Sequence, residues 1–472
     1  MPTRSLLPRV LILIALTFPG VLLGSFPAVT SAVTMNESDR VVSPGGSNSA
    51  SGSRHHPWQT LQKAANSVPA GGTVWVRQGT YAGFTMVRSG LVGDPTRFMA
   101  WPGDDRPVID GDIGNRPVVV RFQGVHDVRI QGFIIRDAAG GVFNGAGVQT
   151  DPGSERIKII DNVITRNQSF GVYPVSSTNI TVQGNDISHN AAGIYVSHAG
   201  AGTRILDNDI HDTDRMIRNT TSPGNDDAGG DGIAFHKTTG RITVSGNRLW
   251  SNRALSHDYG WDGGAFSIYG ASNVTFADNR MWDNENVMET GTDSGLACAG
   301  NSFVRNVAYG AVSAGRAWGM FLRCATDMLI AQNTFVDLGW AFAIGSDSAT
   351  YSGKTDGLRI INNVIDHSGS GGKVYGIVTN LPNSVVIDHN LVWTTGDIAT
   401  WPSGGRTASI TAFRSATGYE SHGKDSSPDF MDRSGVDFRL RASSPAIDLG
   451  TRNNDVGGGY AGAAPDAGRY ER

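Results

Sequence analysis

The stretch IKIIDNVITRN, residues 157–167, decides the fold of this chain because its pattern recurs along the sequence. Two short runs of β-branched residues flank Asn162, and apolar residues alternate with polar ones, as in strands that bury one face. Similar segments occupy 180–190, 242–252, 274–284 and 358–368. One such segment cannot bury its apolar side alone. The repeat therefore predicts a stack of short coils that bury one another.

A column of asparagines marks one corner of the predicted coil. Its members lie between two strands of each copy, and they are Asn162, Asn185, Asn208, Asn247, Asn279, Asn301, Asn333, Asn363 and Asn390, with Gly132 in the first copy. Asn tolerates left-handed backbone and can link neighbouring coils through its amide. We therefore predict an all-β, right-handed parallel β-helix, because leucine-rich solenoids and propellers need other spacings.

Composition supports this class and excludes others. Gly accounts for 62 of 472 residues, as expected for short strands joined by corners. The formal net charge of −4 offers no basic surface for nucleic acid or an anionic membrane, and we expect neither as a partner. A monomer is expected. Cys298 and Cys324 are interpreted as buried small residues, with a single bridge between them left open.

The ends of the chain are predicted to lie outside the coil. Residues 1–32 have a basic start and an apolar run, at 10–23, that is too short for a membrane span, so we predict a signal peptide and a secreted protein. A retained anchor is the alternative. The Ser- and Gly-rich segment 33–54 is predicted to be a disordered linker, 55–435 the coil, and 436–472 a C-terminal cap and tail.

A helix is predicted ahead of the first long strands. The apolar residues that fall on one helical face are Trp58, Leu61, Ala64, Ala65 and Val68, and Pro69 ends the helix. Placed at the start of the coil, this helix would cover strand edges and core side chains that are otherwise open to water.

Several phrases support a family resemblance. The segment 57–83, the phrase RPVIDG at 106–111, the asparagine column and FRLRASSPAIDLG at 438–450 resemble secreted bacterial proteins of the pectate-lyase-like β-helix superfamily. This superfamily carries lyases, glycoside hydrolases, epimerases and non-catalytic adhesins on one coil, so the function has to be argued from a site.

An aromatic stripe is predicted on the outer face of the coil. Strands that begin with Gly place their next residue inward and the following one outward, which exposes Tyr173, Tyr195, Phe266 and Phe321. Aromatic rings laid along parallel strands suit sugar rings, so we predict these as substrate-binding residues. Packing beneath long loops is the alternative for Phe266 and Phe321.

Acidic residues gather on adjacent coils in the middle of the chain. The segments GGDG at 229–232, HDYGWD at 257–262 and VME at 287–289 resemble the three-turn site of calcium-dependent pectate lyases. The resemblance implies calcium ligands at Asp231, Asp258 and Asp262. In that family a fourth acid and a catalytic lysine complete the site. Here Tyr259 and Glu289 take their places.

The missing lysine leaves the base open. Glu289 is predicted to face outward because an unpaired carboxylate in the core is costly. We consider Glu289, Lys237, His236 and Arg323 as catalytic residues, with His236 or Lys237 as the base.

The expectation is a secreted enzyme that cleaves an acidic polysaccharide by calcium-assisted β-elimination. One alternative is a glycoside hydrolase that pairs Glu289 with Asp262 or Asp283. The other is a glycan-binding surface protein without turnover.

Overall fold

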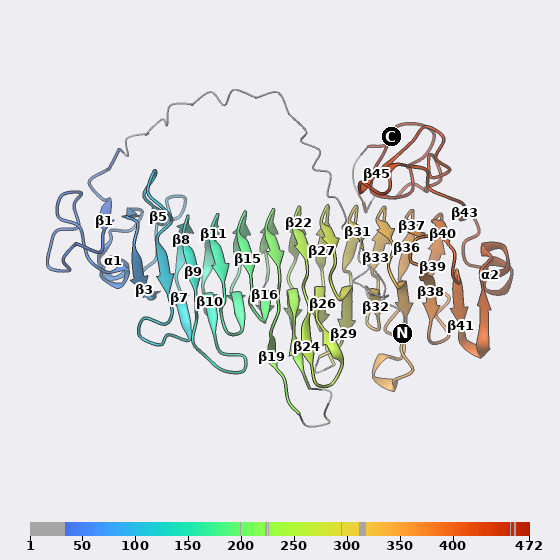
Figure 1. Cartoon of the computed structure of the whole chain (residues 1–472), viewed down its shortest axis with the longest axis horizontal. Helices are drawn as coiled ribbons and strands as arrows, with labels where there is room; N and C mark the ends of the chain where they lie inside the picture. The colour runs from blue at the N-terminus through green and yellow to red at the C-terminus, as the bar shows by residue number, and fades with distance from the viewer. Residues whose placement is uncertain are drawn as a thin grey trace, which may run out of the picture. The chain divides into compact units, whose positions relative to one another are not determined.

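The computed structural model describes residues 34–472 except 199, 222–223, 225, 294, 311–317, 454 and 457–458. The predicted signal peptide, 1–32, lies outside the described residues. Short strands form three long sheets that enclose one apolar core, so the parallel β-helix is confirmed (Figure 1). No helix among the described residues is both long and apolar enough to cross a membrane.

Each coil gives one strand to each of the three sheets, and neighbouring coils pair in parallel. The first sheet, in order, contains β1 (Arg40–Val42), β2 (Thr73–Val76), β5 (Thr96–Ala100), β8 (His126–Gln131), β11 (Glu155–Ile160), β14 (Thr181–Gln183), β17 (Arg204–Leu206), β22 (Ile242–Ser245), β27 (Val274–Ala277), β30 (Ser302–Val304), β33 (Leu329–Ala331), β36 (Arg359–Ile361) and β39 (Val386–Asp388).

The second sheet carries the candidate site. It contains β4 (Phe84–Met86), β7 (Val118–Phe122), β10 (Ala146–Thr150), β13 (Phe170–Pro174), β16 (Ala192–Ser197), β21 (Asp231–His236), β26 (Gly264–Tyr269), β29 (Asn286–Gly291), β32 (Trp318–Leu322), β35 (Trp340–Ile344), β38 (Lys373–Ile377), β41 (Ala399–Trp401) and β42 (Gly405–Thr407). Only its last strand pairs antiparallel.

The third sheet closes the coil. It contains β3 (Thr80–Ala82), β6 (Val108–Asp110), β9 (Ile134–Arg136), β12 (Val163–Thr165), β15 (Asp186–Ser188), β18 (Asp209–His211), β23 (Arg248–Trp250), β28 (Arg280–Trp282), β31 (Val307–Tyr309), β34 (Thr334–Val336), β37 (Val364–His367), β40 (Leu391–Thr394) and β43 (Lys424–Asp425). Hairpins outside the sheets are β19 (Met216–Arg218) with β20 (Ala228–Gly229), β24 (Ala254–Ser256) with β25 (Gly260–Asp262), and β44 (Phe430–Asp432) with β45 (Asp437–Leu440).

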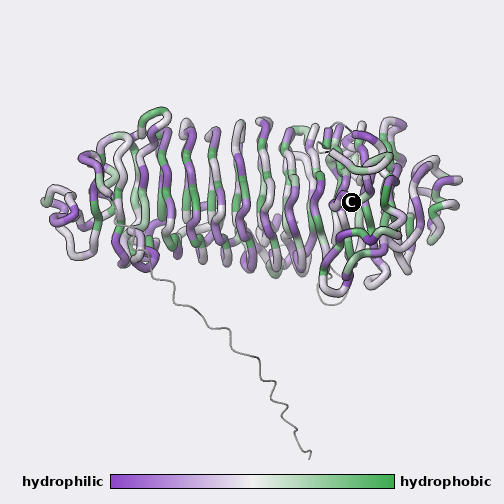
Figure 2. The backbone as a smooth tube through the Cα atoms, turned by 90° about the horizontal axis from the view of Figure 1, so that it is seen from above, coloured by the Kyte–Doolittle hydropathy of each residue, from purple (hydrophilic) through white to green (hydrophobic). Residues whose placement is uncertain are grey.

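In-register stacking builds the core. Ile159 pairs with Val182, and Val182 with Ile205, and all three side chains are fully buried. Apolar and polar residues alternate along the coils in Figure 2, as a strand with one buried face requires. Burying such columns is the main source of stability in a solenoid, because each coil covers the inner side chains of its neighbours.

The asparagine column forms a hydrogen-bonded ladder inside the coil. The Asn208 side-chain amide donates to Asn247 Oδ1 at 2.9 Å, and the Asn247 amide donates to Asn279 Oδ1 at 2.9 Å. The prediction was wrong at one member. Asn306, not Asn301, continues from Asn279 to Asn333.

A second, shorter ladder was not predicted. It lies five residues later at the next corner and links Asn167 to Asn190 and Asn252 to Asn284. Both ladders satisfy buried backbone groups at the corners, where the sheets provide no partners.

The ends of the coil differ from their predicted boundaries. Strand β1 lies inside the predicted disordered linker, because Arg40–Val42 pairs with β2 and buries Val41 and Val42. Helix α1 (Leu61–Ser67) follows, with Leu61, Ala64 and Ala65 buried.

The other end of the coil is closed by helix α2 (Ile410–Thr417), whose Phe413 ring stacks 5.5 Å from Tyr375. The predicted C-terminal cap, 436–472, does not cover this end. It packs beside the third sheet, where Phe438 meets Tyr309 at 5.4 Å. Short 3-10 helices occur at η1 (Ala349–Tyr351) and η2 (Pro402–Gly404).

The two cysteines form the bridge that the sequence left open. Cys298 and Cys324 are disulfide-bonded, with their Cα atoms 5.5 Å apart, and both are fully buried. The bond joins loops of neighbouring coils directly after β29 and β32. It therefore ties together the two neighbouring coils that contain β29 and β32.

Candidate functional site

A pocket of about 890 Å³ opens on the second sheet over β16, β21, β26, β29 and β32. The long insertions that carry the hairpins β19–β20 and β24–β25 form part of its wall. Predicted site residues that line it are Asp231, Asp262, Glu289, His236, Arg323, Tyr195 and Phe321. Stacking of coils thus brings together residues as far apart in the sequence as Tyr195 and Arg323.

The outer column of the second sheet runs through the pocket floor. Strand pairing places Tyr195, Ala234, Ser267, Glu289 and Phe321 side by side on successive coils. Glu289 therefore faces outward, as the burial argument required. Its side chain is 17% exposed.

The prediction for Phe266 was wrong. Gly264 pairs with Asp231 and not with Gly232, so the inward and outward positions fall one residue later than the glycine count assumed, and Phe266 points into the core with no exposure. Ser267 takes the outward position instead. Phe321 remains in the outer column, half-buried against Trp318, with the ring centroids 6.1 Å apart.

Two partly buried carboxylates, Asp231 and Asp262, share one wall of the pocket. Burial raises the pKa of Asp231 to about 8, and repulsion from Asp262 adds to the rise, although the Ser267 hydroxyl donates to the Asp231 carboxylate. Burial also raises the pKa of Asp262 to about 7, with Glu289 contributing and the amide of Gly263 opposing at 2.8 Å. At neutral pH this wall favours a proton or a cation.

The third predicted calcium ligand, Asp258, lies elsewhere. Its carboxylate accepts the backbone N–H groups of Asp226 and Asp227 at 2.8 and 3.2 Å. The ligand atoms of Asp226, Asp227 and Asp258 lie within 4.8 Å of one another, whereas Asp231, Asp258 and Asp262 form no such group. Asp227 also accepts hydrogen bonds from Ser256 and the Thr220 amide. We interpret Asp226, Asp227 and Asp258 as residues whose hydrogen bonds hold the insertion loop in place.

Glu289 is held by a cation from the next coil. The Arg323 guanidinium donates to the Glu289 carboxylate, and Arg323 directly follows the end of β32. Burial lowers the pKa of Arg323, but the Coulombic effect of Glu289 and neighbouring tyrosines outweighs it and the net shift is upward. Both side chains line the pocket. Glu289 is therefore paired with a counter-ion inside the pocket.

His236 and Asp293 form a hydrogen-bonded dyad on the pocket wall. His236 Nε2 contacts the Asp293 carboxylate, and both residues line the pocket. Burial lowers the pKa of His236, although Asp293 opposes this, so the imidazole is neutral at physiological pH. Lys237 also reaches Asp293, at 3.2 Å, but does not line the pocket.

Aromatic rings continue from the pocket toward the N-terminal coils. Tyr195 lies 6.1 Å from the His236 ring and 5.8 Å from Tyr173. Phe143, on the loop before β10, comes within 6.3 Å of Tyr195. Tyr173 is half-buried and lies just outside the pocket. The rings form a short platform beside the carboxylates.

Sequence reasoning missed Asp293, Ser267 and Tyr269, which all line the pocket. Asp293 follows β29 by two residues, and its contact with His236 spans two coils. Nothing in its local sequence signals that contact. Ser267 was detectable, since a correct register places it between Ala234 and Glu289. Asp283 does not line the pocket and lies instead 3.7 Å from Arg253.

Comparison with known proteins finds relatives over parts of the chain. An uncharacterized protein, YwoF, of Bacillus subtilis (strain 168) is 30% identical over 129 residues, 26% of this chain and 28% of that protein. Pectate lyase PEL9 of Emericella nidulans is 36% identical over 90 residues, 18% of this chain and 20% of that protein. The matched region thus spans between a fifth and three tenths of each curated relative.

A solved structure shares the fold at low identity. The complex of XylC with xylose superposes with a TM-score of 0.55 at 11% identity, covering 78% of this chain and 85% of that chain, which shows the fold alone. The crystal structure of pectate lyase Pel9A gives a TM-score of 0.49 at 17% identity, covering 94% of this chain and 98% of that chain. The family model described as "Pel9A-like, right handed beta helix region" matches residues 40–315, more than half of the chain. The chain therefore belongs to the Pel9A-like right-handed β-helix family.

Proposed function

We propose that this chain cleaves an acidic polysaccharide by β-elimination in the pocket on the second sheet. The observation that carries the proposal is the pairing of two opposite features within one cavity. Asp231 and Asp262 form a wall that favours a cation, while Arg323 and His236 line the same cavity. A substrate that carries a carboxylate beside the bond to be broken matches both features.

The residues on this wall fit calcium. Calcium prefers carboxylate oxygens from flexible surroundings, and Asp231 and Asp262 provide them where burial and mutual repulsion make their charges costly. Bound calcium would supply positive charge to neutralise the substrate carboxylate. Asp258 is assigned to the insertion loop rather than to this ion, because its contacts are with Asp226 and Asp227.

His236 is the proposed base. A neutral imidazole can accept the proton next to the sugar carboxylate, and Asp293 holds its ring in place as an orienting carboxylate. As the proton moves to His236, the glycosidic C–O bond breaks, a C=C bond forms, and the leaving oxygen takes a proton from water. Arg323 orients the substrate carboxylate, which competes with Glu289 for the guanidinium.

The test is a product assay on the full chain. Acidic and neutral polysaccharides are incubated with and without a calcium chelator, and ultraviolet absorbance of unsaturated ends is recorded beside reducing ends. We expect chelator-sensitive unsaturated ends, and His236→Ala should lower the rate by about 10²–10⁴-fold. His257→Ala is the matched control, since this exposed histidine lies on the hairpin β24–β25 outside the pocket lining. Full activity in His236→Ala would exclude the proposed base.

Glycoside hydrolysis is the second candidate. Two carboxylates in this pocket have different surroundings, because burial raises the pKa of Asp262 to about 7 while the Arg323 guanidinium pairs with Glu289. Asp262 would donate the proton and Glu289 would act as base or nucleophile. Reducing ends without unsaturation, abolished in Glu289→Gln, would favour this reaction. Retention of polysaccharide without any product would favour a glycan-binding protein.

We also propose that the chain is exported, acts as a monomer, and is capped at its first coils by α1. The buried Cys298–Cys324 disulfide supports an oxidising compartment. Burial of Leu61 and Ala64 of α1 near β1 and β4 supports the cap. The mass of the chain recovered from a culture supernatant tests export. Light scattering of the same material tests the oligomeric state.

A further inference from the structure

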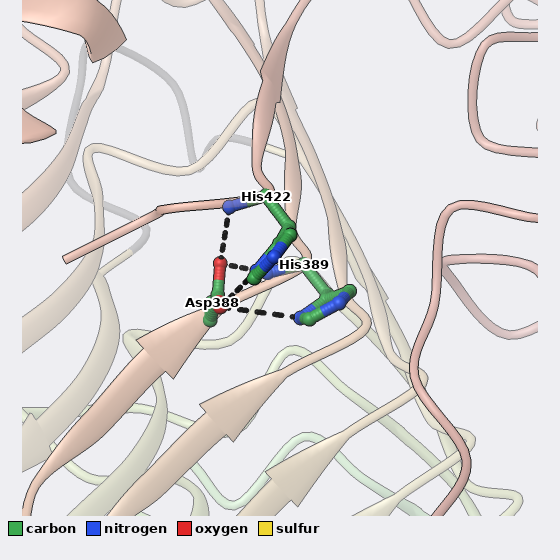
Figure 3. A group of neighbouring side chains, drawn as sticks. All are labelled: Asp388, His389 and His422. Atoms are coloured by element: carbon green, nitrogen blue, oxygen red, sulfur yellow. Dashed lines mark hydrogen bonds and ion pairs between the residues drawn. The ribbon is translucent and has the colours of Figure 1, made fainter.

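The last complete corner of the coil carries a second group of metal-ligand side chains, far from the pocket in the sequence. Asp388 ends β39 and His389 follows it, directly before the final ladder residue Asn390. His422 belongs to the loop between α2 and β43. Figure 3 shows the Asp388 carboxylate beside the two stacked rings, with contacts to both histidines.

The contacts within this group are close and mutual. Asp388 Oδ2 lies 2.7 Å from His422 Nδ1 and 3.3 Å from His389 Nδ1. The His422 backbone N–H donates to Asp388 Oδ1 at 2.7 Å. One ligand atom from each residue lies within 4.8 Å of the others. A modest movement of the side chains is therefore enough to bring all three onto one ion.

The Nδ1 atom of His389 is enclosed at the edge of this group. In the described part of the chain, His389 Nδ1 is shielded from solvent and makes no hydrogen bond, although a carboxylate oxygen lies 3.3 Å away. A buried polar atom that makes no hydrogen bond is uncommon in a folded protein and calls for an explanation such as an ion. We propose that Asp388, His389 and His422 bind one divalent transition metal of the zinc class.

The donor set selects the metal. Two imidazole nitrogens and one carboxylate suit zinc, nickel or copper, whereas calcium requires six to eight oxygens. The rings now stack with their centroids 4.4 Å apart, so one ring has to turn before both nitrogens can face the same ion. The His422 side chain is 65% exposed, so it has room to make that turn while Asp388 remains beside it. Water completes the coordination.

The metal would fasten the end of the coil. The loop that carries His422 also carries Glu420, which accepts a hydrogen bond from the Asn390 side chain at 2.8 Å and so ends the ladder. The Glu420 backbone N–H donates to Ile387 at 2.7 Å. A metal between this loop and β39 would hold the end closed, and this role is independent of catalysis in the pocket.

The binding test uses the full chain stripped with a chelator and dialysed. We expect one equivalent of Zn²⁺ by titration calorimetry, and cobalt(II) substitution should give the visible bands of a low-symmetry nitrogen site. His422→Ala and Asp388→Asn should each weaken zinc binding by at least about tenfold. The double variant His55→Ala/His56→Ala is the matched control, because these adjacent histidines are exposed and lie in the N-terminal part of the chain.

Thermal unfolding provides a second measurement. Zinc in excess should raise the Tm of the wild-type chain by about 3 °C and leave His422→Ala unchanged. Excess calcium should change the Tm of the wild-type chain and of His422→Ala by the same amount, because its effect should not depend on His422. Unchanged zinc affinity in His422→Ala, or a wild-type chain that binds no stoichiometric zinc and gains no cobalt bands, would overturn the proposal.

Discussion

Two polar columns run along the same coil and behave in opposite ways. The asparagine ladder lies inside, and each amide both donates to and accepts from its neighbours, as Asn247 does with Asn208 and Asn279. The outer column of the second sheet changes its residue at every step, from Tyr195 to Ser267 and Glu289. The ladder carries no charge until its last step. The pocket wall gathers carboxylates whose charges are costly.

The difference shows how a repeat protein acquires a site. In-register stacking repeats the same unpaired backbone groups at each corner. A neutral amide, which can both donate and accept hydrogen bonds, can therefore recur from coil to coil. The same stacking places side chains from three or four coils about one strand spacing apart, at 4.7–4.9 Å. A stretch of coil becomes a site where acids and bases replace the repeat, and insertions then wall it off.

Breaking the ladder should have the largest effect. Asn247→Ala leaves the backbone N–H and side-chain amide of Asn208 without their acceptor, and the Ile205 carbonyl without its donor. With buried groups costing about 1–3 kcal/mol each, we expect a loss of about 4 kcal/mol. Urea unfolding measures it. Asn66→Ala on α1, where the side chain is exposed, should change stability by less than about 0.5 kcal/mol.

The charged end of the ladder should give a pH-dependent effect. Burial raises the pKa of Glu420 from 4.5 to about 7, opposed by hydrogen bonds from Tyr375 and Asn390. The folded state holds this proton more tightly than the unfolded one, so its contribution is complete below pH 4.5 and is lost as pH rises through 7. Glu420→Gln should remove about 2 kcal/mol of that decline. Unfolding of both chains between pH 4 and 8 in chelator tests it, and parallel curves would contradict it.

Charge crowding in the pocket should give a smaller effect, because water enters the cavity. The pKa of Asp231, raised from 3.8 to about 8, makes its contribution to stability decline as pH rises through 8. In chelator at pH 8, Asp231→Asn should therefore be more stable than the wild type by about 1 kcal/mol. Adding calcium should stabilise the wild type and not the variant. Equal calcium responses would remove Asp231 from the cation wall.

The fold was predictable because its signal is repeated many times. Alternating strands and an asparagine corner recur in almost every coil, so a single error does no harm. Asn301 and Asn306 both stand in the same short segment, and only the hydrogen bonds to Asn279 and Asn333 distinguish them. The linker prediction failed for a different reason. Three residues of β1 carry too little pattern to be seen, yet pairing with β2 orders them.

The site was predictable only in part because it depends on single residues. Glu289 was placed outward by the cost of burying a charge, which holds whatever register is counted. Phe266 was misplaced because the count began at Gly264, which pairs with Asp231 and so lies one position before the residue equivalent to Gly232. Asp293 reaches His236 across two coils. Loop conformation decides such contacts, and loops have no repeat to reveal them.

The smallest effect is expected at the aromatic end of the outer column, away from the carboxylates. Tyr173 packs 4.3 Å from Phe170 and 5.8 Å from Tyr195, outside the pocket lining, so it can hold a distant sugar without touching the reacting one. Tyr173→Ala should raise KM about threefold on long substrates and leave kcat unchanged, since one ring contact is worth about 0.5–1.5 kcal/mol. Tyr173→Phe should behave as wild type. An equal change on the shortest cleaved oligosaccharide would mean that Tyr173 acts through the structure of the pocket, because only a long chain can reach both the ring and the carboxylate wall.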